Sequence, residues 1–217
     1  MNIRSIKNRH PVFIIGTPRS GTTLTAKILG RHSNIFMPGE THFFDDVYSR
    51  TRELGGFENQ HSRRAVAQQL YTIYSRYYEL PDQQRIERMF PNVSDLSEAI
   101  DDCGDYGAVL DRFMSLQMQA EVKFRWGNNA PRDLFSVREI REFFPNAKIV
   151  VCVRDIRAFL YSYKYKWKVT GDEHVERLKK LYHPVVTSYL WKSSMRQLPM
   201  IEEAIPASDR IVVRYEL

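Results

Sequence analysis

Residues 12–30 read VFIIGTPRSGTTLTAKILG, an apolar run followed by a turn rich in Gly, Pro and Ser and then by a helix-like segment. This order predicts a buried strand, a tight loop and a helix. Gly16 and Gly21 lie five positions apart, with Thr22 and Thr23 directly behind them, which is the spacing of a phosphate-binding P-loop. Such a loop turns backbone N–H groups toward an anion at the start of a helix. The stretch therefore predicts an anion-binding site.

One position departs from the P-loop pattern. Thr22 stands where a Walker A lysine would lie, so the side chain that reaches the β- and γ-phosphates of a nucleoside triphosphate is absent. Arg19 supplies a cation two residues before the second glycine, and a guanidinium can fork onto a phosphate- or sulfate-like group. These features favour an anion-transfer site that is not that of a kinase or an ATPase. A strand, turn and helix that bind no ligand are the alternative.

The composition is that of a globular protein. The 217 residues carry a net charge of +6, and 43% of them are hydrophobic, which suits one sizeable core. No run approaches the ~18–20 apolar residues of a membrane span, and the basic N-terminus lacks the apolar region of a secretory signal. Cys103 and Cys152 are the only cysteines, and Cys152 lies inside an apolar run, so we expect no disulfide framework. We therefore expect a cytoplasmic protein, with a soluble lumenal domain as the alternative.

Positive charge is concentrated between residues 132 and 168, where nine Lys and Arg stand against four Asp and Glu. A patch of this kind suits an anionic ligand, and nucleic acid is the competing ligand. Within the patch, residues 161–168 read YSYKYKWK, an aromatic–lysine run that could stack bases. We prefer the interpretation that one face of this run packs on the sheet, so no nucleic-acid partner is expected.

Apolar runs typical of buried strands alternate with helix-like segments at both ends of the chain. This alternation predicts an α/β fold, a three-layer P-loop-like domain with a central parallel sheet. Residues 161–168 alternate like a strand, but a helix from about Ile156 is required as the crossover that keeps the sheet parallel. Ser136 and Glu139 have the spacing of a capping box. The expected strands span 12–16, 34–37, 147–153 and a buried 210–215, and the expected helices span 22–29, 136–144, 156 onward and 185–204.

The stretch from about 45 to 123 has a different character. It is rich in Tyr, Gln, Arg and Glu, and its apolar residues recur at helical spacing, as at Ala65, Leu70 and Ile73. We expect several helices that form a cap inserted in the α/β domain. No repeat, low-complexity segment or long linker divides the chain, so we expect one domain over 1–217. Because the chain ends just past the last expected strand, its C-terminus looks truncated.

Three features fall at the carboxyl ends of expected strands, where open parallel sheets bind ligands. They are the loop 17–23, the segment 38–42 (PGETH) and Arg154, directly after Val153. Because these ends share one edge of the sheet, we expect the three features to converge. Glu40 is then the carboxylate beside the loop, where it can act as a general base.

Neighbouring residues extend this prediction and also supply alternatives to it. Ser162 follows Arg154 by eight residues on the next expected helix, so the two side chains could hold a second phosphate. Alternatively, Arg154 and Asp155 could form a structural ion pair that caps the helix, and Glu40 could be an ordinary loop carboxylate. His42 is a rival base because imidazole titrates near neutral pH. An extended segment, however, is expected to point His42 in a different direction from Glu40.

Residues 18–24 (PRSGTTL) resemble the 5′-phosphosulfate-binding loop of the sulfotransferases. Residues 153–162, with the eight-residue spacing from arginine to serine, resemble the 3′-phosphate-binding segment of that family. The chain looks most similar to the bacterial and tyrosylprotein-type branch, in which a glutamate after the second strand serves as the base. Further similarity lies at 38–41 (PGET), 145–148 (PNAK) and 214–216 (RYE).

The resemblance implies that 3′-phosphoadenosine 5′-phosphosulfate (PAPS) is the donor, that 3′,5′-ADP is the product and that no metal is required. It implies catalytic roles for Glu40, as general base, and for Arg19. The acceptor is then a hydroxyl or an amine on a small molecule, a glycan or a peptide, and the oligomeric state stays open. The resemblance assigns donor binding to Arg19, Ser20, Gly21, Thr22, Thr23, Arg154, Ser162, Lys166 and Tyr215.

Within this set, the resemblance implies that Arg154 and Ser162 hold the 3′-phosphate, that Lys166 lies near it and that Tyr215 lies near the adenine.

One position of the family pattern differs in this sequence. The branch pattern Trp-Gly-x-Lys-x-Pro appears as WGNNAP, so Asn129 replaces the lysine that supports the leaving phosphate. Loss of one such donor lowers rates by ~10²–10³-fold, unless Arg132 takes its place.

Two other functions remain open from the sequence. The first is a P-loop kinase of a nucleoside or small metabolite, for which Asp155 is the sole candidate Walker B acid. The second is a nucleotide-binding module without catalysis, which the replacement of the lysine by Asn129 makes conceivable.

Overall fold

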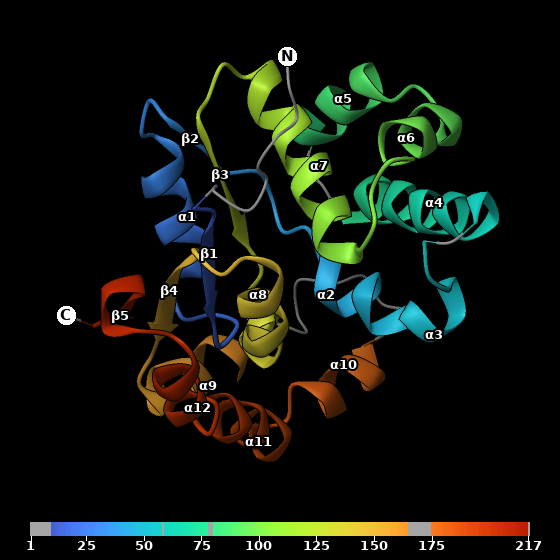
Figure 1. The fold of residues 1–217 in the computed structure, drawn as a ribbon. Coiled ribbons are helices and arrows are strands. Elements are labelled where there is room, and N and C mark those ends of the chain that lie inside the picture. The colour runs from blue at the N-terminus through green and yellow to red at the C-terminus, as the bar shows by residue number, and fades with distance from the viewer. Residues whose placement is uncertain (1–9, 58, 78–79, 165–174, 217) are drawn as a thin grey trace.

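The computed structural model describes residues 10–57, 59–77, 80–164 and 175–216, and its centre is a five-stranded sheet in the order β2-β3-β1-β4-β5 (Figure 1). Neighbouring strands are parallel throughout this sheet, which brings their carboxyl ends to one edge. The predicted α/β fold with a parallel sheet is therefore confirmed. The strands are β1 Val12–Gly16, β2 Ile35–Phe36, β3 Arg125–Asn129, β4 Lys148–Val153 and β5 Arg210–Arg214.

Strand β1 is buried along its whole length because β3 and β4 flank it. Its alternate side chains point to opposite faces of the sheet. Phe13 and Ile15 enter the main hydrophobic core, whereas Ile14 lies in a smaller cluster with Ala26 of helix α1 (Thr22–Gly30). The sheet therefore carries a helix layer on each face, as expected of a three-layer domain.

Two strands differ from what the sequence predicts. Strand β3 reads RWGNN, which lacks apolar alternation and contains Gly and Asn, two residues that are disfavoured in strands. The sequence pattern therefore did not predict a strand at 125–129. Strand β5 pairs only with β4, at the edge of the sheet, and Ile211 and Val212 are 59% and 43% exposed. The prediction of a buried strand at 210–215 is wrong, because an apolar run does not reveal which strand lies at the edge.

Two of the expected helices follow strands β3 and β4. Helix α8 (Val137–Phe143) follows a 3₁₀ turn, and helix α9 (Ile156–Lys164) follows β4 as the expected crossover requires. The end of the aromatic–lysine run, 165–168, lies outside the described residues. The predicted capping box is wrong, because Ser136 makes no side-chain cap hydrogen bond.

The single helix predicted over 185–204 is two helices, α11 (Pro184–Met195) and α12 (Leu198–Ala204), and the short α10 (Val175–Leu181) precedes them. Pro199 explains the break, because it lies in the first turn of α12, where its ring costs no hydrogen bond. Ile201 of α12 enters the main core.

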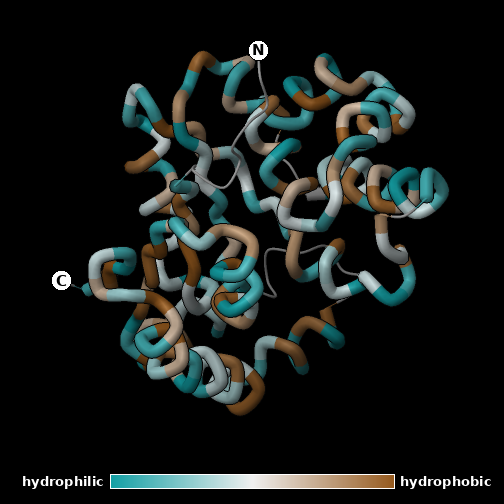
Figure 2. The backbone as a smooth tube through the Cα atoms, in the orientation of Figure 1, coloured by the Kyte–Doolittle hydropathy of each residue, from teal (hydrophilic) through white to brown (hydrophobic). Residues whose placement is uncertain are grey.

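The cap predicted over 45–123 consists of helices, which gather beside one side of the sheet (Figure 1). Hydrophilic and hydrophobic residues alternate along them, as is typical of amphipathic helices (Figure 2). Phe44 and Phe113 of the cap belong to the same buried cluster as Phe13 of β1, so cap and sheet share one core. The cap helices are α2 Phe43–Asp46, α3 Thr51–Leu54, α4 Gln60–Tyr77, α5 Leu80–Met89, α6 Val93–Ala99 and α7 Tyr106–Ala120. Among the described residues, no helix combines the length and the hydrophobicity needed to cross a membrane.

Helix α7 of the cap packs closely on α8 of the α/β domain. A Cβ atom added at Gly107 would lie 2.6 Å from the Cβ and Cγ atoms of Phe143, which leaves no room for a side chain. The glycine therefore sets how closely the cap approaches the sheet domain.

We predict that Gly107→Ala lowers the free energy of unfolding by about 1–3 kcal/mol, because the added methyl group overpacks this contact. Gly104→Ala is the matched control, since a Cβ there meets nothing within 4 Å, and we expect a change within about 0.5 kcal/mol. Urea denaturation of the two variants measures the difference. A Gly107→Ala protein as stable as the control would contradict the contact.

Candidate active site

The loop after β1 has two residues in the left-handed conformation, Arg19 (φ 71°) and Gly21 (φ 91°). This conformation is unusual for arginine and turns successive N–H groups to one side of the loop. Within the described chain, α1 has neither a side-chain cap nor an acidic residue in its first turn. Its first N–H groups are thus available to an anionic ligand.

Ser20 and Gly21 shape this loop from the inside. The buried Ser20 hydroxyl donates to the carbonyl oxygens of Thr17 (2.5 Å) and Cys152 (2.9 Å), which fixes the loop to the end of β4. The Ser20 N–H also donates to Thr17 O, at 3.1 Å. Ser20 therefore stabilises the loop and does not present its hydroxyl to a ligand. A Cβ atom at Gly21 would lie 2.5 Å from Cδ2 of Tyr215, so the glycine allows that ring to pack on the loop.

Arg154 joins the loop to the ends of β4 and β5. Its Nη1 donates to the carbonyl oxygen of Arg19 at 2.8 Å, and its guanidinium lies 4.4 Å from the centre of the Tyr215 ring, a cation–π distance. The Tyr215 N–H donates to Val153 O at 3.0 Å. The buried Nε of Arg154 makes no hydrogen bond within the described residues and lies 3.7 Å from Oε1 of Glu216. The arginine thus lies over the loop with donor capacity left for a ligand.

The alternative ion pair between Arg154 and Asp155 is wrong. Asp155 pairs with Arg157, whose Nε lies 2.9 Å from Oδ1, and the same oxygen accepts from the Arg157 N–H at the start of α9. Hydrogen bonds from the Arg157 side chain and backbone hold the pKa of Asp155 below its usual value. Asp155 is therefore the cap of α9, and Arg154 is left to face the loop.

Helix α9 carries Ser162, the second residue predicted to hold the 3′-phosphate. The Ser162 hydroxyl donates to Phe159 O at 2.7 Å, and Lys166 lies outside the described residues. Next to Ser162, Tyr163 was not expected in the site. Burial, together with smaller effects of Tyr182 and of the charge of Glu40, raises the pKa of Tyr163 to about 12, and the charge of Arg19 partly opposes this. The phenol therefore stays protonated near both catalytic candidates.

A hollow of about 210 Å³ lies at the N-terminus of α1, and it brings the loop together with the segment 38–42. Glu40 and His42 both line it, with Nε2 of His42 3.5 Å from Oε2 of Glu40. The expectation that His42 points elsewhere is wrong: both side chains reach the hollow, and His42, with a φ of 50°, is the N-cap residue of α2 (Phe43–Asp46). The hollow is lined by Pro18, Arg19, Thr22, Thr23, Glu40, His42, Asp45, Ala130, Pro131 and Arg132.

The position of the family lysine is occupied by a buried amide. Asn129 is 4% exposed, and its Oδ1 has no hydrogen-bond partner in the described part of the chain. Arg132, three residues later, lines the hollow, and its Nε lies 3.1 Å from Oδ2 of Asp45. Arg132 therefore brings a second cation to the hollow that already contains Arg19.

A buried polar row lies beneath the segment 38–42, and the sequence did not predict it. The Thr41 hydroxyl donates to Oδ1 of Asn128 (2.9 Å), and Nδ2 of Asn128 donates to Oδ2 of Asp133 (2.7 Å). Complete burial raises the pKa of Asp133 well above its usual value, and the charges of Asp45 and Glu40 raise it further. Two asparagines inside a strand-length segment were the signal that could have indicated this row.

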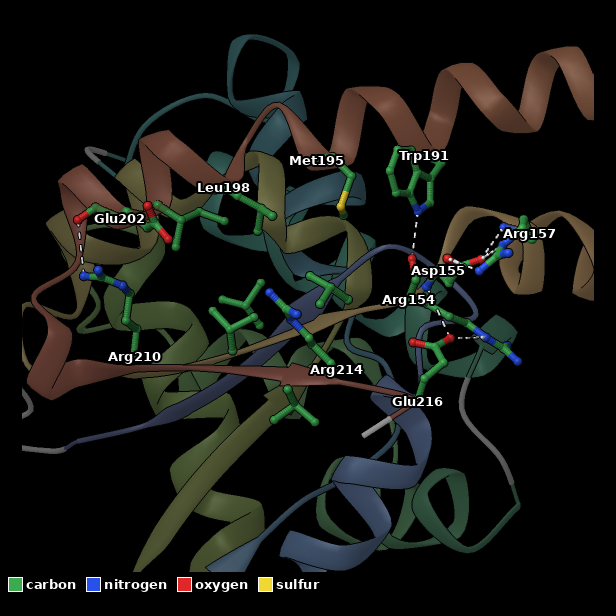
Figure 3. Close-up of a pocket in the computed structure, with 15 residues that line it drawn as sticks. Arg154, Asp155, Arg157, Trp191, Met195, Leu198, Glu202, Arg210, Arg214 and Glu216 are labelled. Carbon is green, nitrogen blue, oxygen red and sulfur yellow. Dashed lines mark hydrogen bonds and ion pairs between the residues drawn. The ribbon is translucent and has the colours of Figure 1, made fainter.

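A larger cavity, of about 1070 Å³, lies between β4, β5 and helices α11 and α12 (Figure 3). Its walls include Met195, Leu198 and Trp191, whose indole N–H donates to Arg154 O at 2.9 Å. Arg154 and Glu216 lie at one end of it (Figure 3). Neither the loop nor Glu40 lines this cavity. The predicted anion loop and the candidate base Glu40 both line the smaller hollow, which is therefore the candidate reaction site.

A sequence model described as the Sulfotransferase family matches residues 11–217. Since the match covers nearly the whole chain, the protein belongs to the sulfotransferase family, whose members are transferases. A 44-residue stretch is 50% identical to an uncharacterized protein of Aquifex aeolicus (strain VF5), and it covers 20% of this chain but only 6% of that protein.

Two solved structures share the fold. The sulfotransferase domain of the Synechococcus PCC 7002 olefin synthase has a TM-score of 0.54 at 19% identity, covering 100% of this chain and 70% of that one. A sulfotransferase domain from the curacin biosynthetic pathway has a TM-score of 0.53 at 17% identity, covering 96% and 68%. At such identities the likeness shows the α/β fold alone.

Proposed function

We propose that this protein transfers a sulfuryl group from PAPS to a hydroxyl or amine acceptor, with Glu40 as general base and 1–217 acting as one sulfotransferase domain. The observation that carries the proposal is the hydrogen bond from Arg154 to Arg19 O. Because this bond holds the Arg154 guanidinium beside the loop, it supports a donor with one phosphate at the loop and a second, the ribose 3′-phosphate, at Arg154. An adenine nucleotide without a 3′-phosphate has no anionic group that the Arg154 guanidinium could bind.

The residues present fit such a donor. Within the described residues, no side chain caps the N–H groups at the start of α1, and the Nε of Arg154 is buried without a hydrogen bond. We assign the 5′ group to the loop 19–23 and the 3′-phosphate to Arg154 and Ser162. Tyr215 would lie beside the adenine, and Lys166 would add a cation.

Transfer would proceed by in-line displacement in the hollow beside the loop. The acceptor oxygen or nitrogen forms a bond to sulfur while the bond from sulfur to the 5′-phosphate oxygen breaks. The acceptor proton passes to Glu40, and 3′,5′-ADP carries away the negative charge that develops on the leaving oxygen. In this proposal the loop N–H groups and the Arg19 guanidinium stabilise that oxygen, and a donor of this kind contributes ~10²–10³-fold to the rate. Arg132 is our candidate for the role of the family lysine.

The alternatives receive less support. A kinase would need the Walker A lysine that Thr22 replaces, and its candidate Walker B acid, Asp155, is engaged with Arg157. A module without catalysis would be favoured by the buried Asn129. The presence of Arg132 in the hollow with Glu40 supports an active enzyme instead.

We predict that Arg154→Ala weakens the binding of 3′,5′-ADP by about 10- to 100-fold, since a charge-assisted hydrogen bond is worth roughly 1.5–3 kcal/mol. The same change should weaken the binding of 5′-AMP, which lacks the 3′-phosphate, by a clearly smaller factor, because 5′-AMP loses only the support that Arg154 gives the loop. Calorimetric titration in EDTA measures both affinities. Equal losses for the two nucleotides would assign Arg154 a structural role, and tight binding of ATP only with Mg²⁺ would favour the kinase.

We predict that Glu40→Gln lowers turnover of PAPS by about 10²–10⁴-fold, the usual contribution of a general base. Binding of 3′,5′-ADP should change little, because the donor contacts lie elsewhere. Release of 3′,5′-ADP is followed with a panel of phenols, alcohols and amines as acceptors. Glu53→Gln is the matched control, since this exposed glutamate pairs only with Arg50 in the cap among the described residues. A Glu40→Gln protein as active as the control would contradict the assignment.

A further inference from the structure

Glu40 lies between two residues that are each fixed by a side chain from another part of the fold. On one side, the Gly39 N–H donates to Oδ2 of Asp82 at 2.8 Å. On the other side, the Thr41 hydroxyl donates to Oδ1 of Asn128 at 2.9 Å. Asp82 belongs to α5 of the cap, and Asn128 belongs to β3 of the sheet. The short segment that carries the base is thus held from two layers at once.

The anchor from the cap is itself held firmly. Nη2 of Arg85 lies 2.5 Å from Oδ1 of Asp82, and the Arg85 side chain is only 11% exposed. The Arg85 guanidinium lies 4.7 Å from the ring centre of Phe36, and Nη2 also donates to Oε1 of the buried Gln117 at 3.2 Å. A buried pair of this kind resists opening, because separating its members leaves a charge without compensation. Asp82 therefore has little freedom to move away from Gly39.

The anchor from the sheet is the buried polar row of Thr41, Asn128 and Asp133. These three residues are 3%, 0% and 1% exposed. Hydrogen bonds in such a dry environment are stronger than at the surface. Thr41 also accepts a hydrogen bond from the Phe43 N–H, at 3.4 Å, so the row fixes the start of α2 as well.

We propose that Asp82, held by Arg85, is a positioning residue for Glu40 that acts through the Gly39 N–H. The cap thereby aligns the base in addition to covering the site. A general base works only within about 2.6–3.2 Å of the proton it removes, and a displacement of about 1 Å can cost 10²-fold in rate. With the sheet anchor alone, the segment can pivot about Thr41. This inference rests on the proposed role of Glu40 as base.

The test is a double-mutant cycle that combines Asp82→Ala with Glu40→Gln and measures 3′,5′-ADP release from PAPS with the fastest acceptor of the panel and with water. We expect Asp82→Ala alone to lower the rate about 10- to 100-fold. On the Glu40→Gln background it should lower the rate less than about twofold, because a residue that acts through Glu40 has nothing left to position. The affinity for 3′,5′-ADP should stay within about twofold.

Three further variants separate positioning from stability. Asp82→Asn keeps an acceptor for the Gly39 N–H and should recover most of the rate. Asp82→Glu keeps the charge that pairs with Arg85 but displaces the carboxylate by one methylene. This variant replaces Asp82→Ala in the cycle if Asp82→Ala does not fold. Asp102→Ala is the control, because Asp102 also pairs with an arginine of the cap, Arg112, at 2.7 Å, in a more exposed place (60% against 19% for the Asp82 side chain), and bonds no described residue of 38–42.

Hydrogen exchange measured by mass spectrometry reports whether Asp82 holds the segment 38–42, and this measurement needs no turnover. Asp82→Ala should speed exchange at 38–42, and Asp102→Ala should not. Unchanged exchange at 38–42, or an equal loss of rate with and without Glu40→Gln, would overturn the positioning role. A wild-type protein that binds no 3′,5′-ADP would instead refute the proposed function, which the exchange result does not address.

Discussion

The hydrogen bond from Arg154 Nη1 to the carbonyl oxygen of Arg19 is the interaction on which the candidate site depends. It ties the end of β4 to the loop after β1, and the Tyr215 ring from the end of β5 lies against both Arg154 and Gly21. Three strand ends are thereby locked together. Because the loop and the Arg154 guanidinium are fixed relative to each other, the proposed donor site would suit one spacing between two phosphate groups. Such preorganisation is what a reaction with little covalent chemistry for the protein requires.

The second constraint is the shared core of cap and sheet. Phe13 of β1, Phe44 of α2 and Phe113 of α7 lie in one buried cluster, so the cap cannot shift without disturbing the sheet. The segment that carries Glu40 runs between these two layers and is hydrogen-bonded to both, at Gly39 and at Thr41. The position of the carboxylate beside the loop is therefore a consequence of packing far from it. We infer that the cap contributes to the alignment of the proposed base.

The sequence predicted the parts that rest on local patterns. Strands at 12–16 and 147–153, the loop with its glycines and the helix after Ile156 follow from hydrophobic periodicity and turn residues. The pattern missed β3, because RWGNN is stabilised by buried polar contacts, and it misjudged β5, because edge position depends on the whole sheet. Sequence also failed for His42, whose direction depends on a left-handed φ, and for Asp82, whose contact with Gly39 joins residues 43 positions apart. Long-range contacts of this kind leave no periodic signal.

A crystal structure of the protein with 3′,5′-ADP tests the central claim most directly. We expect the 5′-phosphate against the N–H groups at the start of α1 and the 3′-phosphate within hydrogen-bonding distance of the Arg154 guanidinium. We also expect the hydrogen bond from Arg154 to Arg19 to persist. A nucleotide seated in the larger cavity against Trp191, with nothing bound at the loop, would contradict this claim.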